Sequence, residues 1–315
     1  SLKKIYRIID CASEIGLEAI KFQTFDLDEM TLNLNSNEFR LTNNFSNKKW
    51  NNRNLYSLYK DAQLPFEWHK KIFKRAEKKG LICFSSVFDN KSLNFLENLN
   101  CPAYKIASME NLHFPLINDV LKKNKPVIIS TGTLSFDEIK KLLNFTNKKI
   151  KSLVIMYCLT EYPAKYKNLN FNFIKKLKKK KNLIVGFSDH TNDNIAAITA
   201  TSLGVNVIEK HFKLFENDKT LDSEFSFGPK QMEKLIIDTK NIWQTFQNYN
   251  DDISSDEKFY KKFRRSIYAT KTINKGEKIK KDNIRIIRPG LGLEPKYYNK
   301  ILGKKAIKRI DVGVG

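Results

Sequence analysis

The sequence of 315 residues predicts an α/β fold, a parallel β/α barrel followed by a small, mostly β domain. Seven short apolar runs rich in β-branched residues recur before residue 245, and amphipathic helical stretches separate most of them. After residue 262 the pattern changes to short strand-like runs between Gly and Pro turns. We therefore expect a barrel at residues 1–245, a polar linker at residues 246–262 and the small domain at residues 263–315.

The predicted barrel strands share an apolar, β-branched character and lie at residues 19–24, 81–88, 103–107, 126–130, 152–159, 183–187 and 205–210. A complete barrel of this kind has eight strands. The chain opens instead on an amphipathic helix whose apolar stripe includes Ile5, Ile9 and Ala12, and such a helix normally follows a strand. We therefore expect that the first strand is missing from this chain. In the small domain we expect strands at residues 266–269, 284–287 and 306–310.

Composition and charge narrow the classes of function. The formal charge of +23 raises nucleic acid or an anionic substrate as a partner. The lysines are spread over polar helix faces without the interleaved aromatic residues of a base-stacking surface, so we expect no nucleic-acid role. No apolar run approaches the roughly 18 to 20 residues that span a bilayer, so we expect no membrane segment. The four cysteines lack CxxC spacing, which favours reduced thiols and a cytoplasmic location.

Two segments carry the most chemical information. Residues 186–191 and 208–212 each close a predicted strand with a histidine beside acidic residues, and a helix predicted at residues 194–203 joins the strands. This order is a βαβ unit, so His190 and His211 lie at the carboxyl ends of neighbouring parallel strands. Because imidazole is a common ligand for divalent metals, the pair predicts a shared metal site. The alternative is that each histidine is a hydrogen-bonded core residue.

Other strand ends carry lysines and hydroxyl groups. Lys21 and Lys105 lie within apolar runs, where a buried charge is costly unless it is paired with an anion. The alternative for either lysine is that its stem packs while its charge reaches solvent. Since the carboxyl ends of barrel strands form one mouth, two lysines and several hydroxyls there predict a phosphate or carboxylate ligand. The polar residues that accompany the lysines are Gln23, Ser86, Ser108, Ser130, Thr160 and Tyr162.

Eight motifs, taken together, resemble the sialic acid synthase family, also called the NeuB type, across essentially the whole chain. They are KFQTF, YKIAS, STG, YPA, GFSDHT, IEKHF, FRRSIYA and RPGLGL, which begin at residues 21, 104, 130, 162, 186, 208, 263 and 288. The resemblance implies a TIM barrel followed by an antifreeze-like (SAF) β-clip domain, in a domain-swapped homodimer. Trp50 and residues 55–59, 62–69 and 288–297 resemble the pseudaminic acid synthase branch of the family.

The resemblance implies a condensation of phosphoenolpyruvate with the open-chain aldehyde of an N-acetylated amino sugar. Phosphate is released and a nine-carbon 2-keto acid forms. In the pseudaminic branch the sugar is 2,4-diacetamido-2,4,6-trideoxy-L-altrose. A divalent metal, Mn, Mg or Co, on His190 and His211 would polarise the aldehyde. Three alternatives stay open: a neuraminate or legionaminate synthase, a Schiff-base aldolase that uses Lys21 or Lys105, and a basic, non-enzymatic binding protein.

The family pattern also implies roles for individual residues. Those that would hold phosphoenolpyruvate are Lys21, Lys105, Ser108, Ser130 and Ser188, with Ser86 and Thr160 as further candidates. Those that would lie near the sugar are Gln23 and three residues expected to be catalytic, Tyr162, Glu209 and Asp222. Of these, Glu209 or Asp222 would move protons. Arg288 from the small domain of the partner chain would close the site over an N-acyl group.

The sequence departs from the family pattern at three places. The family's first strand, with an acidic residue and an Asn-His motif, has no counterpart, so we expect this chain to be inactive by itself. Phe227-Gly228 stands where Leu and an acidic residue are usual, which predicts a weaker start for the next helix. Thr133 stands where methionine is usual after the STG turn, which predicts a change of packing.

Overall fold

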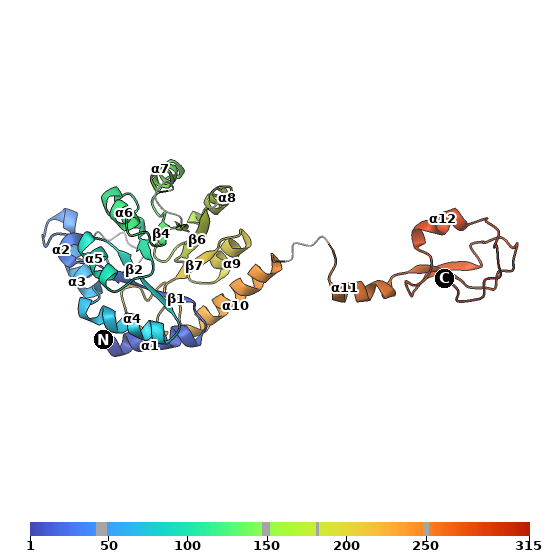
Figure 1. Ribbon diagram of the computed structural model, residues 1–315, viewed down its shortest axis with the longest axis horizontal. Coiled ribbons are helices and arrows are strands. Elements are labelled where there is room, and N and C mark those ends of the chain that lie inside the picture. Colours follow the sequence, from blue (N-terminus) through green and yellow to red (C-terminus); the bar gives the residue numbers. More distant parts are fainter. Residues whose placement is uncertain (42–48, 147–151, 181–182, 248–251) are drawn as a thin grey trace. The chain divides into compact units, whose positions relative to one another are not determined.

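A computed structural model describes residues 1–41, 49–146, 152–180, 183–247 and 252–315. The chain forms two compact units, unit 1 at residues 1–247 and unit 2 at residues 248–315. Unit 1 contains a curved sheet of seven strands whose order in space follows their order in the sequence. All neighbouring strands are parallel, and helices cover the outer face of the sheet (Figure 1). The predicted α/β barrel architecture is therefore confirmed.

Each of the seven predicted barrel strands is present. They are β1 (Ala19–Thr24), β2 (Ile82–Val87), β3 (Tyr104–Ile106), β4 (Val127–Ser130), β5 (Leu153–Cys158), β6 (Ile184–Asp189) and β7 (Val207–Lys210). The helices of unit 1 are α1 (Leu2–Glu14), α2 (Leu27–Met30), α3 (Leu55–Ala62), α4 (Phe66–Lys78), α5 (Asn90–Asn98), α6 (Phe114–Leu121), α7 (Phe136–Thr146), α8 (Asn172–Lys178), α9 (Ile195–Ser202) and α10 (Pro229–Thr245).

The inner strands are buried because one face packs against helices and the other lines the barrel interior. Val127 and Ile129 of β4 are fully buried in the main core, together with Ile117 of α6. Helix α9 confirms the helix predicted at residues 194–203. It ends at Ser202, and Gly204, which follows shortly after, has a φ of +83° that favours glycine. Helix α10 begins at Pro229, although Gly228 stands where the family pattern has an acidic residue. The start of the helix is stabilised instead by the Gln231 side chain, which accepts a hydrogen bond of 3.1 Å from the Gly228 N–H.

Strands β1 and β7 form the two ends of the strand order, and within the described residues they do not pair with each other. Their residues are more exposed than those of the inner strands: Gln23 of β1 is exposed, and all four residues of β7 are only partly buried. Every residue of β3, by contrast, is buried. The described barrel is therefore open between its edge strands.

Unit 2 is a small domain with its own core. Its elements are α11 (Ser255–Tyr260), a 3₁₀ turn at Lys261–Phe263, β8 (Ser266–Ala269), β9 (Ile284–Ile287), a 3₁₀ turn at Pro295–Tyr297 and α12 (Tyr298–Ile301). Strands β8 and β9 confirm the strands predicted at residues 266–269 and 284–287. They pair antiparallel, and Ile267, Ile273 and Ile284 form the centre of the core.

The prediction of a strand at residues 306–310 is wrong. The chain makes only isolated bridges there, from Lys305 to Lys278 and from Ile310 to Ile273. Ala306 packs into the core while Ile307 is 87% exposed, so the backbone bends away from its partner between the two bridges. A short helix, α11, also lies within the segment predicted as a linker.

The four cysteines are all free thiols, and three of them are buried. In the parts of the chain that the structure describes, no helix combines the length and the apolar character that crossing a bilayer requires.

Candidate active site

A cluster of one carboxylate and two lysines occupies the inner face of the sheet. Glu209 on β7 accepts a contact of 2.8 Å from Lys105 Nζ on β3 and one of 2.9 Å from Lys21 Nζ on β1. Ser188 Oγ on β6 donates a hydrogen bond of 2.8 Å to Glu209 Oε1. Because alternate residues of a strand face the same side, strands from different parts of the sheet deliver these groups to the barrel interior. Four predicted site residues thus meet at one point.

The cluster has an excess of positive charge. Burial alone would raise the pKa of Glu209, but Lys105 and Lys21 hold that pKa well below its usual range, so Glu209 is ionised at neutral pH. Burial lowers the pKa of Lys105 to about 8, although Glu209 opposes this effect. The side chain of Lys105 is 1% exposed. Two ammonium groups, one buried and one partly exposed, therefore face a single, largely buried carboxylate, which suits an anionic ligand.

The two predicted metal ligands lie side by side. The ring centroids of His190 and His211 are 5.4 Å apart. His190 Nδ1 donates a hydrogen bond of 2.9 Å to the carbonyl of Leu159, which leaves the lone pair on Nε2. Burial, followed by the neighbouring His211, lowers the pKa of His190 to about 3, so its ring is neutral at physiological pH. His211 Nδ1 lies 3.5 Å from Oδ2 of Asp222.

These imidazoles fit part of a metal site. A divalent metal binds the neutral imidazole, and a ligand histidine usually donates its other nitrogen to a carbonyl or carboxylate. His190 meets both conditions, and Asp222 gives His211 a carboxylate neighbour. The described residues contain no group of three or more His, Cys, Asp or Glu side chains placed to hold one ion. The two histidines would therefore be an incomplete set of ligands.

The turn after β4 gathers three of the predicted hydroxyl residues. Asn111, which is 2% exposed, donates from Nδ2 to the carbonyls of Ser130 at 3.2 Å and Gly132 at 2.8 Å. A Cβ atom at Gly132 would lie 2.6 Å from both Ser108 Oγ and Thr160 Cγ2, so only glycine fits there. Ser108, Ser130 and Thr160 thus lie around one tightly packed turn.

Thr133, which follows this turn, has a φ of +68°. A β-branched residue in the left-handed region is strained, and such strain often marks a functional site.

Tyr162 packs against His190, the first of the two histidines. Its ring centroid is 4.3 Å from that of His190. Burial raises the pKa of its phenol, and negative charge on Cys158, Asp222 and Glu209 adds to the effect. The three residues expected to be catalytic, Tyr162, Glu209 and Asp222, are therefore close to one another.

Three predicted site residues, Gln23, Ser86 and Arg288, form no hydrogen bond with the cluster around Glu209 among the described residues. Ser86 pairs in register with Lys105 on one side and with Gln23 on the other, so all three face the barrel interior. Among the described residues, the side chains of Gln23 and Ser86 make no hydrogen bond to the cluster. Arg288 is exposed and belongs to unit 2, which is described by itself.

Sequence reasoning missed Glu110 and Asn111. Within the described chain, Glu110 Oε2 is the buried side-chain oxygen without a hydrogen-bond partner, and burial raises the pKa of this carboxyl to about 7. A carboxylate two residues after Ser108, just beyond a strand end, was a usable sequence signal. Asn111 gave no such signal, because its role depends on a turn that lies about twenty residues further along the chain.

The outer face of the same strands carries a second ion pair. Asp189 of β6 and Lys210 of β7 are 2.9 Å apart, with side chains 0% and 1% exposed. Lys210 also donates to the Thr191 carbonyl, and its ammonium lies 4.2 Å from the centre of the Phe227 ring. Asp189 and Lys210 are adjacent in sequence to the two histidines, so this pair holds the ends of both histidine-bearing strands.

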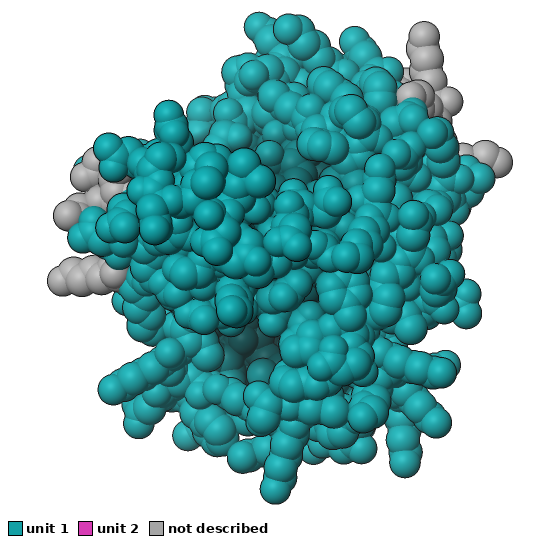
Figure 2. Space-filling view, turned by 90° about the vertical axis from the view of Figure 1, so that its left-hand side faces the viewer, with its two compact units in different colours: residues 1–247 teal, residues 248–315 magenta. Residues whose placement is uncertain are grey.

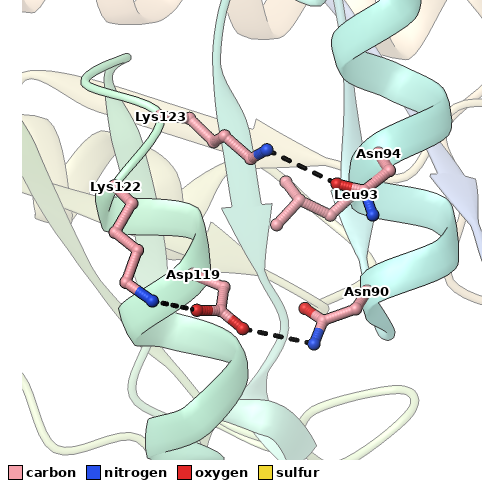
Figure 3. Close-up of a pocket in the computed structure, with 6 residues that line it drawn as sticks. All are labelled: Asn90, Leu93, Asn94, Asp119, Lys122 and Lys123. Atoms are coloured by element: carbon pink, nitrogen blue, oxygen red, sulfur yellow. Dashed lines mark hydrogen bonds and ion pairs between the residues drawn. The ribbon is translucent and has the colours of Figure 1, made fainter.

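A surface depression of about 220 Å³ lies elsewhere, on the outer helical layer between α5 and α6 (Figure 3). Its charged groups are paired with each other, including Lys122 with Asp119 at 2.7 Å. Asn90 also donates to Asp119, and Lys123 donates to Asn94. Figure 2 shows further hollows in the surface of unit 1. The α5–α6 depression contains none of the predicted site residues.

Comparisons with known proteins give family matches that cover most of the chain. The NeuB family model matches residues 8–251, and the SAF domain model matches residues 264–313. Pseudaminic acid synthase of Campylobacter jejuni subsp. jejuni serotype O:2 is 37% identical over 316 residues, 99% of this chain and 90% of that protein. Pseudaminic acid synthase of Helicobacter pylori is 35% identical over 94% of this chain and 86% of that protein.

A solved structure is also similar. It is the N-acetylneuraminic acid (sialic acid) synthetase of Leptospira borgpetersenii serovar Hardjo-bovis in complex with citrate. Its TM-score is 0.71 and its sequence identity 27%, and the match covers 82% of this chain and 84% of that one.

Proposed function

Because the chain belongs to the NeuB family, we propose that it condenses phosphoenolpyruvate with the open-chain aldehyde of an N-acetylated amino sugar. The products are phosphate and a nine-carbon 2-keto acid, with one water consumed. We further propose 2,4-diacetamido-2,4,6-trideoxy-L-altrose as the acceptor, which makes the protein a pseudaminic acid synthase. The pseudaminic acid synthases of Campylobacter jejuni and Helicobacter pylori, which match nearly the whole chain, support this choice of sugar.

The shared carboxylate of Glu209 is the observation that carries the proposal. Lys105 and Lys21 both contact it, so their combined charge is only half compensated. Phosphoenolpyruvate bears a phosphate and a carboxylate, and either group can take up that excess charge while accepting hydrogen bonds from serine hydroxyls. Ser188 contacts the cluster directly, and Ser108, Ser130 and Thr160 surround the neighbouring turn.

The acidic residues divide the proton transfers between them. Glu209 is held ionised by its lysines, so it can accept a proton but has none to donate at neutral pH. Glu110, with a pKa raised to about 7 by burial, can carry a proton at neutral pH and give it up. Asp222, which lies close to His211, and the Tyr162 phenol, which lies against His190, would hydrogen-bond the hydroxyls of the acceptor.

His190 and His211 would hold a divalent cation, which when bound supplies Lewis-acid polarisation of the aldehyde oxygen. The carbonyl of Leu159 fixes the His190 tautomer that such binding needs. Mn, Mg and Co all suit imidazole and oxygen ligands.

The test is to incubate the full-length protein, with added Mn, Mg or Co, with phosphoenolpyruvate and each candidate amino sugar, and to measure phosphate release and product mass. We expect a product whose mass equals both substrates plus water minus phosphoric acid, with the trideoxy altrose giving the highest kcat/KM. The His211→Ala variant is the inactive control. Phosphate release with no acceptor at all would contradict the condensation, and a higher kcat/KM with another sugar would contradict the pseudaminic assignment.

We also propose a homodimer in which Arg288 of one chain serves the site of the partner. Family membership supports this arrangement, and within the described residues Arg288 makes no ion pair of its own. Arg288→Ala subunits mixed with inactive His211→Ala subunits should regain part of the activity, because some heterodimers then contain one intact site. If no activity returns although subunit exchange is confirmed, Arg288 does not act across the dimer.

A further inference from the structure

His190 and His211 each lie directly beyond the last paired residue of their strands. The ladder between β6 and β7 ends where Asp189 pairs with Lys210. The ladder therefore stops one residue short of both histidines. A divalent ion needs its nitrogen ligands at about 2 Å, so contacts other than the ladder have to fix the distance between the two rings.

Lys210 holds the chain on both sides of His190. Its ammonium lies 2.9 Å from Oδ2 of Asp189, the residue before His190, and donates to the carbonyl of Thr191, the residue after it. The Thr191 N–H donates a hydrogen bond of 2.8 Å to Oδ1 of Asp189. The backbone that carries His190 is thus closed into a small ring of polar contacts, to which Lys210 contributes from the neighbouring strand.

Lys210 is also linked to the backbone of His211, its neighbour in the sequence. The N–H of Phe227 donates a hydrogen bond of 2.8 Å to the His211 carbonyl. The ammonium of Lys210 lies 4.2 Å from the centre of the Phe227 ring, where a cation is attracted to the ring face. A single side chain therefore contacts groups that fix the backbones of both histidines.

The ion pair of Asp189 and Lys210 is suited to positioning as well as to stability. A buried ion pair often stabilises a fold no more than two well-packed apolar side chains of similar volume, because both charges lose their hydration. Apolar side chains would fill the same space, but they would not hold the Thr191 carbonyl or its N–H in a fixed direction. The ion pair therefore adds directional contacts, and those contacts surround the two histidines.

Resting on the proposed function, we propose that Lys210 is a positioning residue for the divalent cation. With Asp189 it fixes the separation of His190 and His211, whose ring centroids are 5.4 Å apart, and so sets the affinity of the two histidines for the ion. Loss of a contact that orients metal ligands typically costs about 10- to 100-fold in metal affinity. Lys210 lies on the outer face of the sheet, so it acts through the histidines and not by contact with a substrate.

The main test is a double variant, Asp189→Leu with Lys210→Met, which removes both charges and keeps the space filled. Its stability to urea should exceed that of Lys210→Met alone, because no charge is left buried without a partner. Metal-free full-length protein is titrated with Mn²⁺, and electron paramagnetic resonance measures the free ion. We expect the Kd for Mn²⁺ to rise about 10- to 100-fold in the double variant. The visible absorption of bound Co²⁺, which reports the arrangement of its ligands, should change as well.

Ile117→Ala is the matched control, because Ile117 is fully buried in the main core on α6, whereas the histidines follow β6 and β7. It should lower stability through the cavity that it leaves, while the Kd for Mn²⁺ and the Co²⁺ spectrum stay as in the wild type. This control separates a loss of stability from a loss of positioning. Lys210→Arg is a second variant, which keeps a charge beside Asp189 but holds its donors in a planar fork. Its Kd for Mn²⁺ should also rise.

A folded double variant that binds Mn²⁺ as tightly as the wild type overturns the inference. If circular dichroism shows that the double variant does not fold, wild-type affinity in Lys210→Arg overturns it instead. A wild type that binds neither ion overturns it too. A failure of the proposed function is a different result, in which the protein binds the ion but no acceptor reacts with phosphoenolpyruvate. A Kd for Mn²⁺ that depends on Lys210 would stand even then.

Discussion

Two ion clusters, one fully and one largely buried, lie on opposite faces of strands β6 and β7, and they differ in charge balance. On the outer face, one carboxylate, Asp189, meets one ammonium, Lys210, at 2.9 Å. On the inner face, one carboxylate, Glu209, meets two ammonium groups. A balanced pair leaves no charge for a ligand and contributes to the fold, whereas the unbalanced cluster has positive charge left for an anion. Charge balance, more than burial, separates a structural ion pair from a binding site here.

The largest effect should come from breaking the balanced pair. Lys210→Met leaves Asp189 ionised and buried with no counter-charge, which costs about 3–5 kcal/mol in the free energy of unfolding. Urea denaturation followed by circular dichroism measures this cost. Lys234→Met, which removes an exposed lysine paired with Asp238 on α10, is the control and should change stability little. An unfolding free energy equal to that of the wild type would show that Asp189 finds another partner.

Removing a lysine from the unbalanced cluster should act on the substrate instead. In Lys105→Met, Glu209 keeps Lys21 and Ser188 as partners, so the fold should lose less stability than in Lys210→Met. The anion site loses a charge-assisted contact of about 1.5–3 kcal/mol, which corresponds to roughly a 10- to 100-fold lower kcat/KM for phosphoenolpyruvate. Steady-state kinetics and urea denaturation of the same variant test both statements. Lys91→Met, an exposed lysine paired with Asp26, serves as the kinetic control. Unchanged kinetics would remove Lys105 from the anion site.

Asn111 sharpens the contrast because it is a buried, neutral group that holds the turn beside the predicted site residues. Asn111→Ala leaves the carbonyls of Ser130 and Gly132 without their donor, which should cost about 1–3 kcal/mol of stability. The turn that holds Ser108 and Thr160 then relaxes, so the KM for phosphoenolpyruvate should rise as well. Asn94→Ala on the surface of α5 is the matched control. A loss of stability without a change in this KM would make Asn111 purely structural.

The smallest effect should be a pH dependence that only the unbalanced cluster shows. The pKa of Lys105 is about 8, against 10.5 for an ordinary lysine, because burial disfavours its charge. The charge offered to phosphoenolpyruvate is then lost as the pH rises through 8, so kcat/KM should fall by up to about tenfold for each further pH unit. In Lys105→Arg the guanidinium stays charged, and this decline should disappear. A decline that persists in Lys105→Arg would belong to another group.

The lowered pKa of Lys105 should affect stability in the opposite direction: kcat/KM falls as the pH rises above 8, whereas the stability of the fold rises. Between pH 8 and 10.5 the unfolded chain keeps this proton while the folded chain has lost it. The contribution of Lys105 to stability is therefore fully present above pH 10.5 and is lost as the pH falls through about 8. Thermal unfolding between pH 7.5 and 10 in wild type and Lys105→Arg measures this contribution as the difference between the two proteins.

The barrel could be predicted from the sequence because each strand repeats a strong local pattern. Apolar, β-branched runs separated by helices specify parallel strands wherever both faces are buried, and all seven were found. The prediction of a strand at residues 306–310 failed because the same apolar pattern also occurs in a segment that forms two isolated β-bridges and bends between them. The local sequence of a segment does not show whether the neighbouring strand can pair with it continuously.

The candidate site was predictable only in part. Strand ends in a parallel sheet meet at one rim, so the placement of Lys21, Lys105, Ser188 and Glu209 followed from topology. That both lysines would share Glu209 did not follow, because it depends on side-chain geometry across the barrel. The packing of Trp50, Tyr162 and Phe225 against one another was equally hard to predict, since these rings come from loops that have no fixed register with one another.

The placement of the rings on loops has a consequence for how such a protein can diversify. The groups that surround Glu209 stand on strands, where a change of size or charge disturbs the sheet and its neighbours. Trp50 and Phe225 stand on loops, which tolerate replacement and insertion far better. Under the proposed function, relatives can therefore exchange the sugar they accept through loop substitutions while the strand-borne groups around Glu209 stay unchanged. Laboratory evolution toward new nine-carbon acids should accordingly accumulate its first successful mutations in the loops that follow the strands.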